Sequence, residues 1–200
     1  MLCVSKSLFA ITTATIVAFS STYSAEAREP FADVAAVSSL RPGGFQWNRQ
    51  ESSEGPIEIV VSLPQQRAYV FRGDTLIGVS TVSSGRPGYD TPTGSYAILQ
   101  KARFHRSNLY ESAPMPFMQR LTWDGIALHA GAVPDHPASH GCIRLPPQFA
   151  RDLFAMTELG ATVHITAAIP DSPETALAMV RAGAEFTGMG GPDPEVGPRD

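Results

Sequence analysis

The stretch ASHGCIRL, residues 138–145, decides how the rest of this sequence is interpreted. It contains Cys142, one of two cysteines in the chain; the other, Cys3, lies at the extreme N-terminus. His140 stands two residues before the thiol, and His129 lies a short way upstream. A thiol accompanied by histidines is typical of nucleophilic catalysis, because the attacking species is the thiolate and an imidazole can accept its proton. We therefore interpret the chain as a cysteine enzyme.

The sequence on both sides of this stretch predicts a mostly β fold. Short runs of β-branched and aromatic residues, separated by Gly, Pro or Asp, are typical of strands and hairpins. Between two of the runs, residues 102–118 contain two prolines and little periodicity, which favours a long loop or flap. The runs themselves occupy residues 57–61, 68–71, 76–79, 95–100, 125–128 and 161–165.

One substantial helix is expected directly after the cysteine stretch. Pro146 and Pro147 suit the first turn of a helix, where the amide hydrogen that proline lacks has no helical partner in any case. Apolar residues then recur on one side of the expected helix, and Gly160 supplies a stop. The helix would therefore lie next to Cys142.

Residues 1–27 predict a signal peptide. Lys6 supplies a positive charge, residues 8–19 form an apolar run too short to span a bilayer comfortably, and Ala25-Glu26-Ala27 fits a cleavage site. The alternative is an uncleaved membrane anchor, which the short apolar run disfavours. The mature chain is expected outside the cytoplasm, in the periplasm or the cell wall. Cys142 would then be its only thiol, with no partner for a disulfide.

The rest of the chain divides into three segments. Residues 28–55 mix polar, charged and scattered apolar residues without a sustained period, which favours a linker or an irregular arm. Residues 56–168 hold the strand pattern and form the expected catalytic domain. Residues 169–200 are expected to be a C-terminal tail, with a short helix from Ser172 through Phe186 and a disordered end.

The charge of the chain argues against some classes of partner. With 15 lysines and arginines against 19 acidic residues, the formal net charge is −4, and the lysines are Lys6 and Lys101. Nucleic-acid binding calls for a clustered basic face, so no nucleic-acid partner is expected. At 43% hydrophobic and 17% charged residues, the composition is that of a globular domain with a buried core.

Two histidines compete for the role of base. His129 is the better candidate, because it ends an expected strand and precedes a loop with Gly and Pro that can bring Cys142 back beside it. His140 shares a face with Cys142 only if the backbone between them is extended. His105 and His164 are expected at the surface.

Other residues suggest supporting roles. Gly141 lets the backbone bend sharply and leaves space for the amides of residues 141 and 142 to act as an oxyanion hole. Arg144 is suited to binding a carboxylate through two parallel hydrogen bonds. Ser139 would hydrogen-bond a histidine or shape the turn. Thr91-Pro92-Thr93-Gly94, taken alone, predicts only a turn.

Two other interpretations of the cysteine stretch stay open on the residues alone. A single cysteine is commonly an inert buried side chain, and a nearby histidine is commonly a satisfied polar group. Alternatively, His129, His136, His140 and Cys142 would supply nitrogen and sulfur ligands for zinc, although their spacing matches no common zinc pattern. We expect no metal and no cofactor.

Residues 139–145 resemble the signature of the L,D-transpeptidase catalytic domain, a family of peptidoglycan-modifying enzymes. The resemblance covers about residues 56–167, which is nearly the whole expected domain. It implies a β-sandwich-like domain with a helix beside the active site, in agreement with the strand and helix pattern. The similarity outside the signature lies at residues 66–70, 84–85, 91–94 and 128–129.

The resemblance also implies a role for each residue of the site. Cys142 would be the nucleophile and His129 its base, oriented by the carbonyl of Ala130. The amides of Gly141 and Cys142 would form the oxyanion hole. The residues that would shape the site and contact the substrate are Ser139, His140 and Arg144.

The sequence departs from the family pattern after the first histidine. Many members have His-Gly-Thr or His-Ser and a longer loop, whereas this chain has His129-Ala130-Gly131 and a short loop with prolines. A main-chain carbonyl survives this change. The departure therefore bears on substrate preference and not on catalysis.

The implied reaction is acyl transfer in two steps. Cys142 would attack the carbonyl of the third residue of a tetrapeptide stem and release the terminal D-alanine. An amine would then resolve the thioester: a neighbouring stem, giving a 3-3 cross-link, a lysine of an outer-membrane lipoprotein, or a free D-amino acid. The alternatives are an L,D-carboxypeptidase with water as acceptor, a related cell-wall hydrolase, and a non-catalytic wall-binding module. Residues 102–118 would form a lid.

Overall fold

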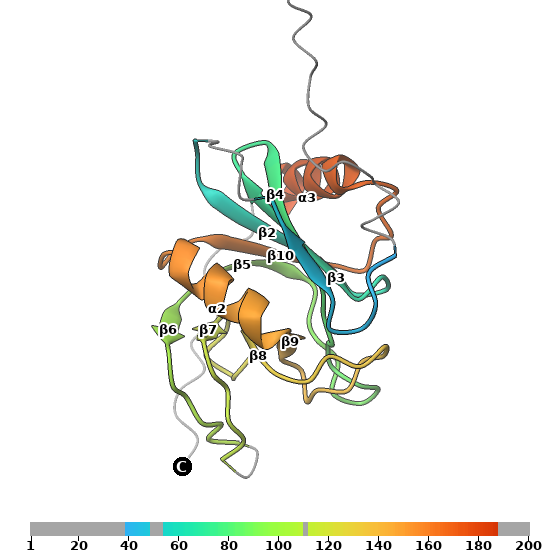
Figure 1. The fold of residues 1–200 in the computed structure, drawn as a ribbon. Helices are drawn as coiled ribbons and strands as arrows, with labels where there is room; N and C mark the ends of the chain where they lie inside the picture. Colours follow the sequence, from blue (N-terminus) through green and yellow to red (C-terminus); the bar gives the residue numbers. More distant parts are fainter. Residues whose placement is uncertain (1–38, 49–53, 110–111, 188–200) are drawn as a thin grey trace, which may run out of the picture.

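The computed structural model describes residues 39–48, 54–109 and 112–187, which fold into two β-sheets and two helices (Figure 1). The larger sheet has the strand order β1-β4-β3-β2-β10-β5, and the smaller has the order β6-β7-β8-β9. The mostly β fold expected from the sequence is confirmed. The strands are β1 (Phe45–Trp47), β2 (Ile57–Ser62), β3 (Arg67–Arg72), β4 (Thr75–Thr81), β5 (Gly94–Ala97), β6 (Gln100–Ala102), β7 (Met118–Arg120), β8 (Ala127–Ala130), β9 (Ile143–Leu145) and β10 (Thr162–Thr166). The helices are α2 (Pro147–Met156) and α3 (Pro173–Thr187).

Part of the segment expected to be a linker or irregular arm is packed on the domain. Residues 28–38 and 49–53 lie outside the described residues, as does the expected signal peptide. The described part contains β1, which pairs antiparallel with β4. Trp47 of β1 stacks on Phe149 of α2, with ring centroids 4.4 Å apart. Within the described ranges, no helix is both long and apolar enough to cross a membrane.

The larger sheet is buried on both faces. Ile59 and Val61 point into the main core, which lies between this sheet, α2 and the smaller sheet. Val60 and Phe71 point to the opposite face, where they pack with α3. Successive side chains of a strand point to opposite faces, so a strand covered on both sides has a continuous apolar stretch, here residues 59–61.

Helix α3 closes the outer face of the larger sheet. The helix expected from Ser172 through Phe186 corresponds to α3 (Pro173–Thr187), although the sequence assigns it to a tail and not to an element that covers the sheet. Its Arg181 pairs with Glu58 of β2 at 2.7 Å, and Glu58 lies 3.4 Å from Nε2 of His164 on β10. The expectation that His164 is a surface residue is wrong, because it is 5% exposed. The groups that surround it come from distant parts of the chain, which local sequence patterns do not reveal.

The smaller sheet determines where the cysteine stretch, residues 138–145, lies in the fold. Strands β8 and β9 are parallel, and residues 131–142 return the chain from the end of one to the start of the other. Helix α2 follows β9 directly and begins with Pro147 after Pro146, as predicted, so a helix lies beside the site.

Strands β6 and β7 continue outward as a hairpin arm. Backbone hydrogen bonds join Ser107 to Ala113 and Met115 to His105, which extends the antiparallel pairing beyond the sheet. The arm projects from the body of the protein (Figure 1). The flap expected at residues 102–118 is therefore an ordered hairpin over most of its length, with residues 110–111 outside the described residues.

Candidate active site

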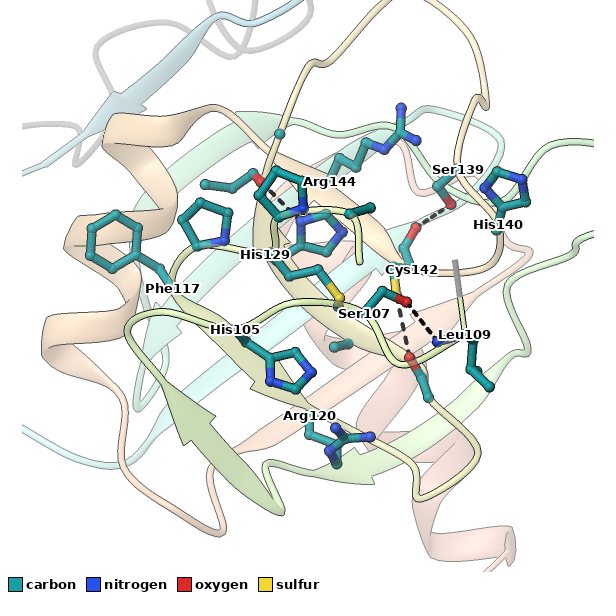
Figure 2. Close-up of a pocket in the computed structure, with 18 of the residues that line it drawn as sticks. His105, Ser107, Leu109, Phe117, Arg120, His129, Ser139, His140, Cys142 and Arg144 are labelled. Atoms are coloured by element: carbon teal, nitrogen blue, oxygen red, sulfur yellow. Dashed lines mark hydrogen bonds between the residues drawn. The ribbon is translucent and has the colours of Figure 1, made fainter. Parts of the chain in front are cut away.

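Strand register brings the expected nucleophile and base to one face of the smaller sheet. In the parallel pair β8–β9, Leu128 is opposite Ile143, and His129 is opposite Arg144. Leu128 and Ile143 point into the core. Because side chains alternate along a strand, His129 and Arg144 point to the other face, as does Cys142 next to Ile143. Figure 2 shows the His129 ring and the Cys142 sulfur on this face, in one cavity.

The cavity has a volume of about 830 Å³, which is enough for a peptide segment. Its floor is formed by β8, β9 and the residues before β9, and its wall by the hairpin arm. His105, expected at the surface, lines the cavity from this arm. Among the described residues that line it, Arg120 and Arg144 are cations and Asp124 is the one carboxylate. The site is thus suited to a substrate with negative charge.

His129 is held in one orientation. Its Nδ1 lies 2.9 Å from the carbonyl oxygen of Ala130, the contact that the sequence resemblance implies. A carbonyl only accepts hydrogen bonds, so Nδ1 carries the proton of the neutral ring and Nε2 is the basic nitrogen. Burial lowers the pKa of His129, an effect that the Ala130 hydrogen bond opposes and that Arg144 and His105 reinforce. His129 is therefore neutral, and able to accept a proton, at neutral pH.

Cys142 rests as a neutral thiol. Its Sγ donates a hydrogen bond to the carbonyl oxygen of Gly125 at 3.3 Å. Burial raises the pKa of the Cys142 thiol, and a hydrogen bond from the Ala127 amide and the charges of Arg120 and Arg144 only partly offset this effect. Neither the thiol nor the imidazole favours its charged form. The resting pair is thus thiol and imidazole, and not thiolate and imidazolium.

Ser139 fixes the backbone around the thiol. Its buried hydroxyl donates to the Cys142 carbonyl at 2.5 Å and accepts from the Gly141 amide at 3.1 Å. Gly141 has a φ of +111°, and a Cβ at this position would lie 2.9 Å from Ile126, so a glycine is required. The Gly141 amide would have to share or release its bond to Ser139 to serve in an oxyanion hole. In the described part of the chain no acceptor is seen for the Cys142 amide.

Residues far from the cysteine stretch in sequence hold it in place. The carbonyl of Ser84 accepts hydrogen bonds from the amides of Ala138 and Ser139. The Oγ1 of Thr91 donates to the Gly141 carbonyl at 2.8 Å and accepts from the Gly85 amide at 2.8 Å. Taken alone, residues 91–94 predict only a turn, and Ser84 and Gly85 carry no sign of this role. The signal that could have found them is the family resemblance around residues 84–85 and 91–94.

His140 and His136 do not point toward His129. The His140 ring lies on the opposite side of Cys142 from His129 and packs edge-on against Tyr89, with ring centroids 4.7 Å apart (Figure 2). His136 hydrogen-bonds the adjacent aspartate at the surface. Among the described residues, no three His, Cys, Asp or Glu side chains are placed to hold a metal ion. The four residues considered as zinc ligands therefore do not converge.

Comparison with known protein families adds to this geometry. The family model described as the L,D-transpeptidase catalytic domain (YkuD) matches residues 56–165, more than half of the chain. The chain belongs to the L,D-transpeptidase catalytic domain family. The resemblance read from the sequence is thereby confirmed.

Known L,D-transpeptidases are similar to this chain over part of their length. The probable L,D-transpeptidase 3 of Mycobacterium tuberculosis (strain ATCC 25618 / H37Rv) is 28% identical over 151 residues, which cover 66% of this chain and 53% of that protein. The chain thus spans about half the length of this curated relative. The crystal structure of an L,D-transpeptidase from Mycobacterium tuberculosis H37Rv aligns with a TM-score of 0.53 at 26% identity, over 56% of this chain and 57% of that one. The L,D-transpeptidase structure from Stackebrandtia nassauensis has a TM-score of 0.54 at 24% identity, over 73% of this chain and 70% of that one, and shares the fold.

The departure from the L,D-transpeptidase family pattern has a local effect at Arg144. Many members have a threonine two residues after the first histidine, in the pattern His-Gly-Thr, and this chain has Gly131 at that position. A Cβ at Gly131 would lie 3.2 Å from carbons of the Arg144 side chain. The missing side chain therefore gives Arg144 room to lie against the end of β8, with its guanidinium at the cavity.

Proposed function

We propose that this protein is a peptidoglycan L,D-transpeptidase, in which a tetrapeptide stem acylates Cys142 and an amine then takes the acyl group. The observation that carries the proposal is the placement of His129 and Cys142 on one face of the β8–β9 pair, inside the cavity. Membership of the L,D-transpeptidase family supports it. The cationic Arg120 and Arg144 are suited to the carboxylates of a stem peptide.

The first half-reaction forms a thioester. Nε2 of His129 accepts the thiol proton as Sγ of Cys142 bonds to the carbonyl carbon of the third stem residue, and the carbonyl electron pair moves onto oxygen. The Cys142 amide donates a hydrogen bond to this oxyanion. The Ala130 carbonyl holds the imidazolium in place. When the oxyanion collapses, the C–N bond breaks, and His129 gives its proton to the amine of the leaving D-alanine.

The second half-reaction transfers the acyl group. His129 takes a proton from the acceptor amine as the nitrogen bonds to the thioester carbon, and the C–S bond then breaks and the thiol regains its proton. The acceptors included in the proposal are a neighbouring stem, a lysine of an outer-membrane lipoprotein and a free D-amino acid. With water as acceptor the same thioester gives an L,D-carboxypeptidase.

The proposal places the protein outside the cytoplasm, in the periplasm or cell wall, where stem peptides are found. It rests on the sequence of residues 1–27, with its apolar run and its Ala25-Glu26-Ala27 site. N-terminal sequencing of the protein from a cell-envelope fraction tests it: a start at Arg28 supports export with cleavage, and an intact Met1 in the cytoplasm contradicts it.

Intact mass spectrometry after mixing the protein with a tetrapeptide stem tests the chemistry. We expect a transient adduct on Cys142 together with free D-alanine, and a Cys142→Ser control with neither. Adding an amine acceptor then separates transfer from hydrolysis by the products formed. No adduct and no D-alanine, with a reduced thiol confirmed, would exclude the transpeptidase and favour a hydrolase of another bond or a wall-binding module.

A further inference from the structure

The peptide bond between Gly141 and Cys142 is anchored by a hydroxyl on its buried side. Its carbonyl oxygen accepts a hydrogen bond from Oγ1 of Thr91 at 2.8 Å. The same Oγ1 accepts from the amide of Gly85 at 2.8 Å, so the hydroxyl connects two main-chain groups that are distant in sequence. Thr91 is 5% exposed, and neither it nor Gly141 is among the residues that line the cavity, whereas Cys142 is.

Because the peptide bond is planar, this contact also determines the direction in which the Cys142 N–H points. No cis peptide occurs in the described ranges. In a trans peptide the N–H points opposite to the C=O. Because the Gly141 carbonyl points toward the buried Thr91, the Cys142 N–H points away from it, toward the cavity side.

The neighbouring hydrogen bonds make this amide the available oxyanion donor. The Gly141 amide is bound to Ser139 Oγ, and the same hydroxyl donates to the Cys142 carbonyl. Ser139 therefore fixes the two ends of the Gly141–Cys142 segment, but it does not bond the carbonyl between them. The rotation of the central peptide plane is set by Thr91.

We propose that Thr91 is a positioning residue that aims the Cys142 amide at the oxyanion of the acyl-transfer reaction. The inference rests on the proposed function, because it concerns the transition state of thioester formation. Thr91 does not touch the substrate and acts through the main chain. A hydroxyl is needed because it accepts from Gly85 and donates to Gly141 at once; a valine of similar shape does neither and would leave both buried groups unpaired.

Comparing two reactions of Cys142 in the full-length protein tests the proposal. Acylation by a tetrapeptide stem passes through an oxyanion, whereas alkylation by iodoacetamide displaces iodide and needs no oxyanion hole. Removing an oxyanion donor typically lowers kcat by about 10² to 10³-fold. We expect Thr91→Val, which misdirects the donor without removing it, to lower kcat for acylation roughly 10- to 100-fold. KM and the alkylation rate should stay within about twofold, and Thr91→Ser should restore acylation to within about threefold.

The matched control is Thr93→Val, the same substitution at an exposed position of the same turn, which should leave both reactions unchanged. An equal fall in acylation and alkylation would overturn the proposal, since Thr91 would then only hold the thiol or the fold. Unchanged acylation in Thr91→Val would overturn it as well. If Thr91→Val does not fold, Thr91→Ala, checked by circular dichroism, is judged by the same two rates. If the wild-type protein itself does not acylate, the proposed function is wrong. If the wild-type protein acylates and Thr91→Val acylates equally well, the proposed function stands and only the role of Thr91 is wrong.

Discussion

At the scale of single residues, burial sets the acid–base behaviour of the site. It raises the pKa of the Cys142 thiol and lowers the pKa of His129, so both shifts favour uncharged groups. The thiol must therefore lose its proton at the moment of attack and not beforehand. This makes general-base catalysis by His129 a requirement of the mechanism.

The pH dependence of Cys142 reactivity follows from these directions. A raised thiol pKa means little thiolate near neutrality, so the alkylation rate should climb about tenfold per pH unit between about pH 6 and 8. The stem acylation rate depends on neutral His129, whose lowered pKa keeps it a base below the usual imidazole value; the acid limb of that profile should lie below about pH 6.5. Quenched alkylation reactions analysed by mass spectrometry give the pH dependence of alkylation. Initial rates of stem acylation give the pH dependence of acylation. A neutral-pH plateau of alkylation would instead indicate a preformed ion pair.

Histidine variants provide the control for this prediction. His129→Ala should lower acylation by on the order of 10²- to 10⁴-fold, the usual contribution of a general base, with a nearly unchanged alkylation profile. His140→Ala should lower acylation much less, because its ring packs against Tyr89 on the other side of the thiol. Normal acylation in His129→Ala together with an inactive His140→Ala would show that the base has been assigned to the wrong histidine.

The sequence identified the residues whose significance is local in the chain. Cys142 and His129 stand in short motifs, and the register of β8 and β9 explains why they meet. Thr91 and His164 were misjudged because their roles depend on distant partners. Thr91 bonds the carbonyl of Gly141, and His164 bonds Ser95 and Glu58 on the neighbouring strands. Neither contact leaves a periodic or compositional signal around the residue itself.

At the scale of elements, the hairpin arm between β6 and β7 forms a wall of the cavity without contributing the nucleophile or base. Replacing residues 108–112 by Asn-Gly would shorten it while keeping the Ser107–Ala113 pair, because Asn-Gly favours a two-residue hairpin turn. We expect acylation to stay within about threefold, a change of less than ~1 kcal/mol. The ratio of amine transfer to hydrolysis should fall about fivefold or more, since that wall shields the thioester from water.

Product analysis by liquid chromatography and mass spectrometry gives that ratio. Phe104→Ser is the matched control, because Phe104 lies on the same arm, is 85% exposed and does not line the cavity. Loss of acylation with an unchanged ratio would show that the arm orders the site and does not govern acceptor choice.

Elements are predictable where their residues alternate or form apolar runs, as in β2, β3, β4, β10 and helix α2, whereas the single strand expected at residues 95–100 is divided between β5 and β6 of different sheets. The three-residue strand β1 is too short to show a period, so the sequence of residues 28–55 does not reveal it. The pairing of β10 parallel to β2 and antiparallel to β5 was not predictable, because register depends on which distant strands meet.

At the scale of the whole molecule, an ion-pair network attaches α3 to the larger sheet. Burial alone would raise the pKa of Glu58, but hydrogen bonds and charge from Arg181 and His164 lower it overall. A carboxyl with a lowered folded-state pKa stabilises the fold above its unfolded pKa, and this contribution is lost as the pH falls through the folded value. Arg181→Met should therefore lower the free energy of unfolding by about 1 kcal/mol at neutral pH and by much less near pH 3.

Urea denaturation at the two pH values measures this difference. Arg151→Met is the control, because the Arg151 side chain is 53% exposed and pairs with the adjacent Asp152 of its own helix, so this pair attaches no other element and its loss should change stability very little at either pH. Alkylation of Cys142 should be unaffected in both variants. An equal loss of stability at both pH values would mean that the methylene groups of Arg181, and not its charge, attach the helix.

The parallel β8–β9 pair also determines where this protein can be re-engineered. Strand register puts the nucleophile and the base on one face, so we expect one residue inserted within 143–145 to turn Cys142 to the wrong face. The connection behaves differently: residues 138–139 are anchored to Ser84 and Gly131 is bonded to Leu145, whereas residues 132–135 run between these two anchors. That short segment is an interchangeable part, into which loops of other lengths and chemistries can be grafted to retarget the enzyme while its reacting atoms keep their places.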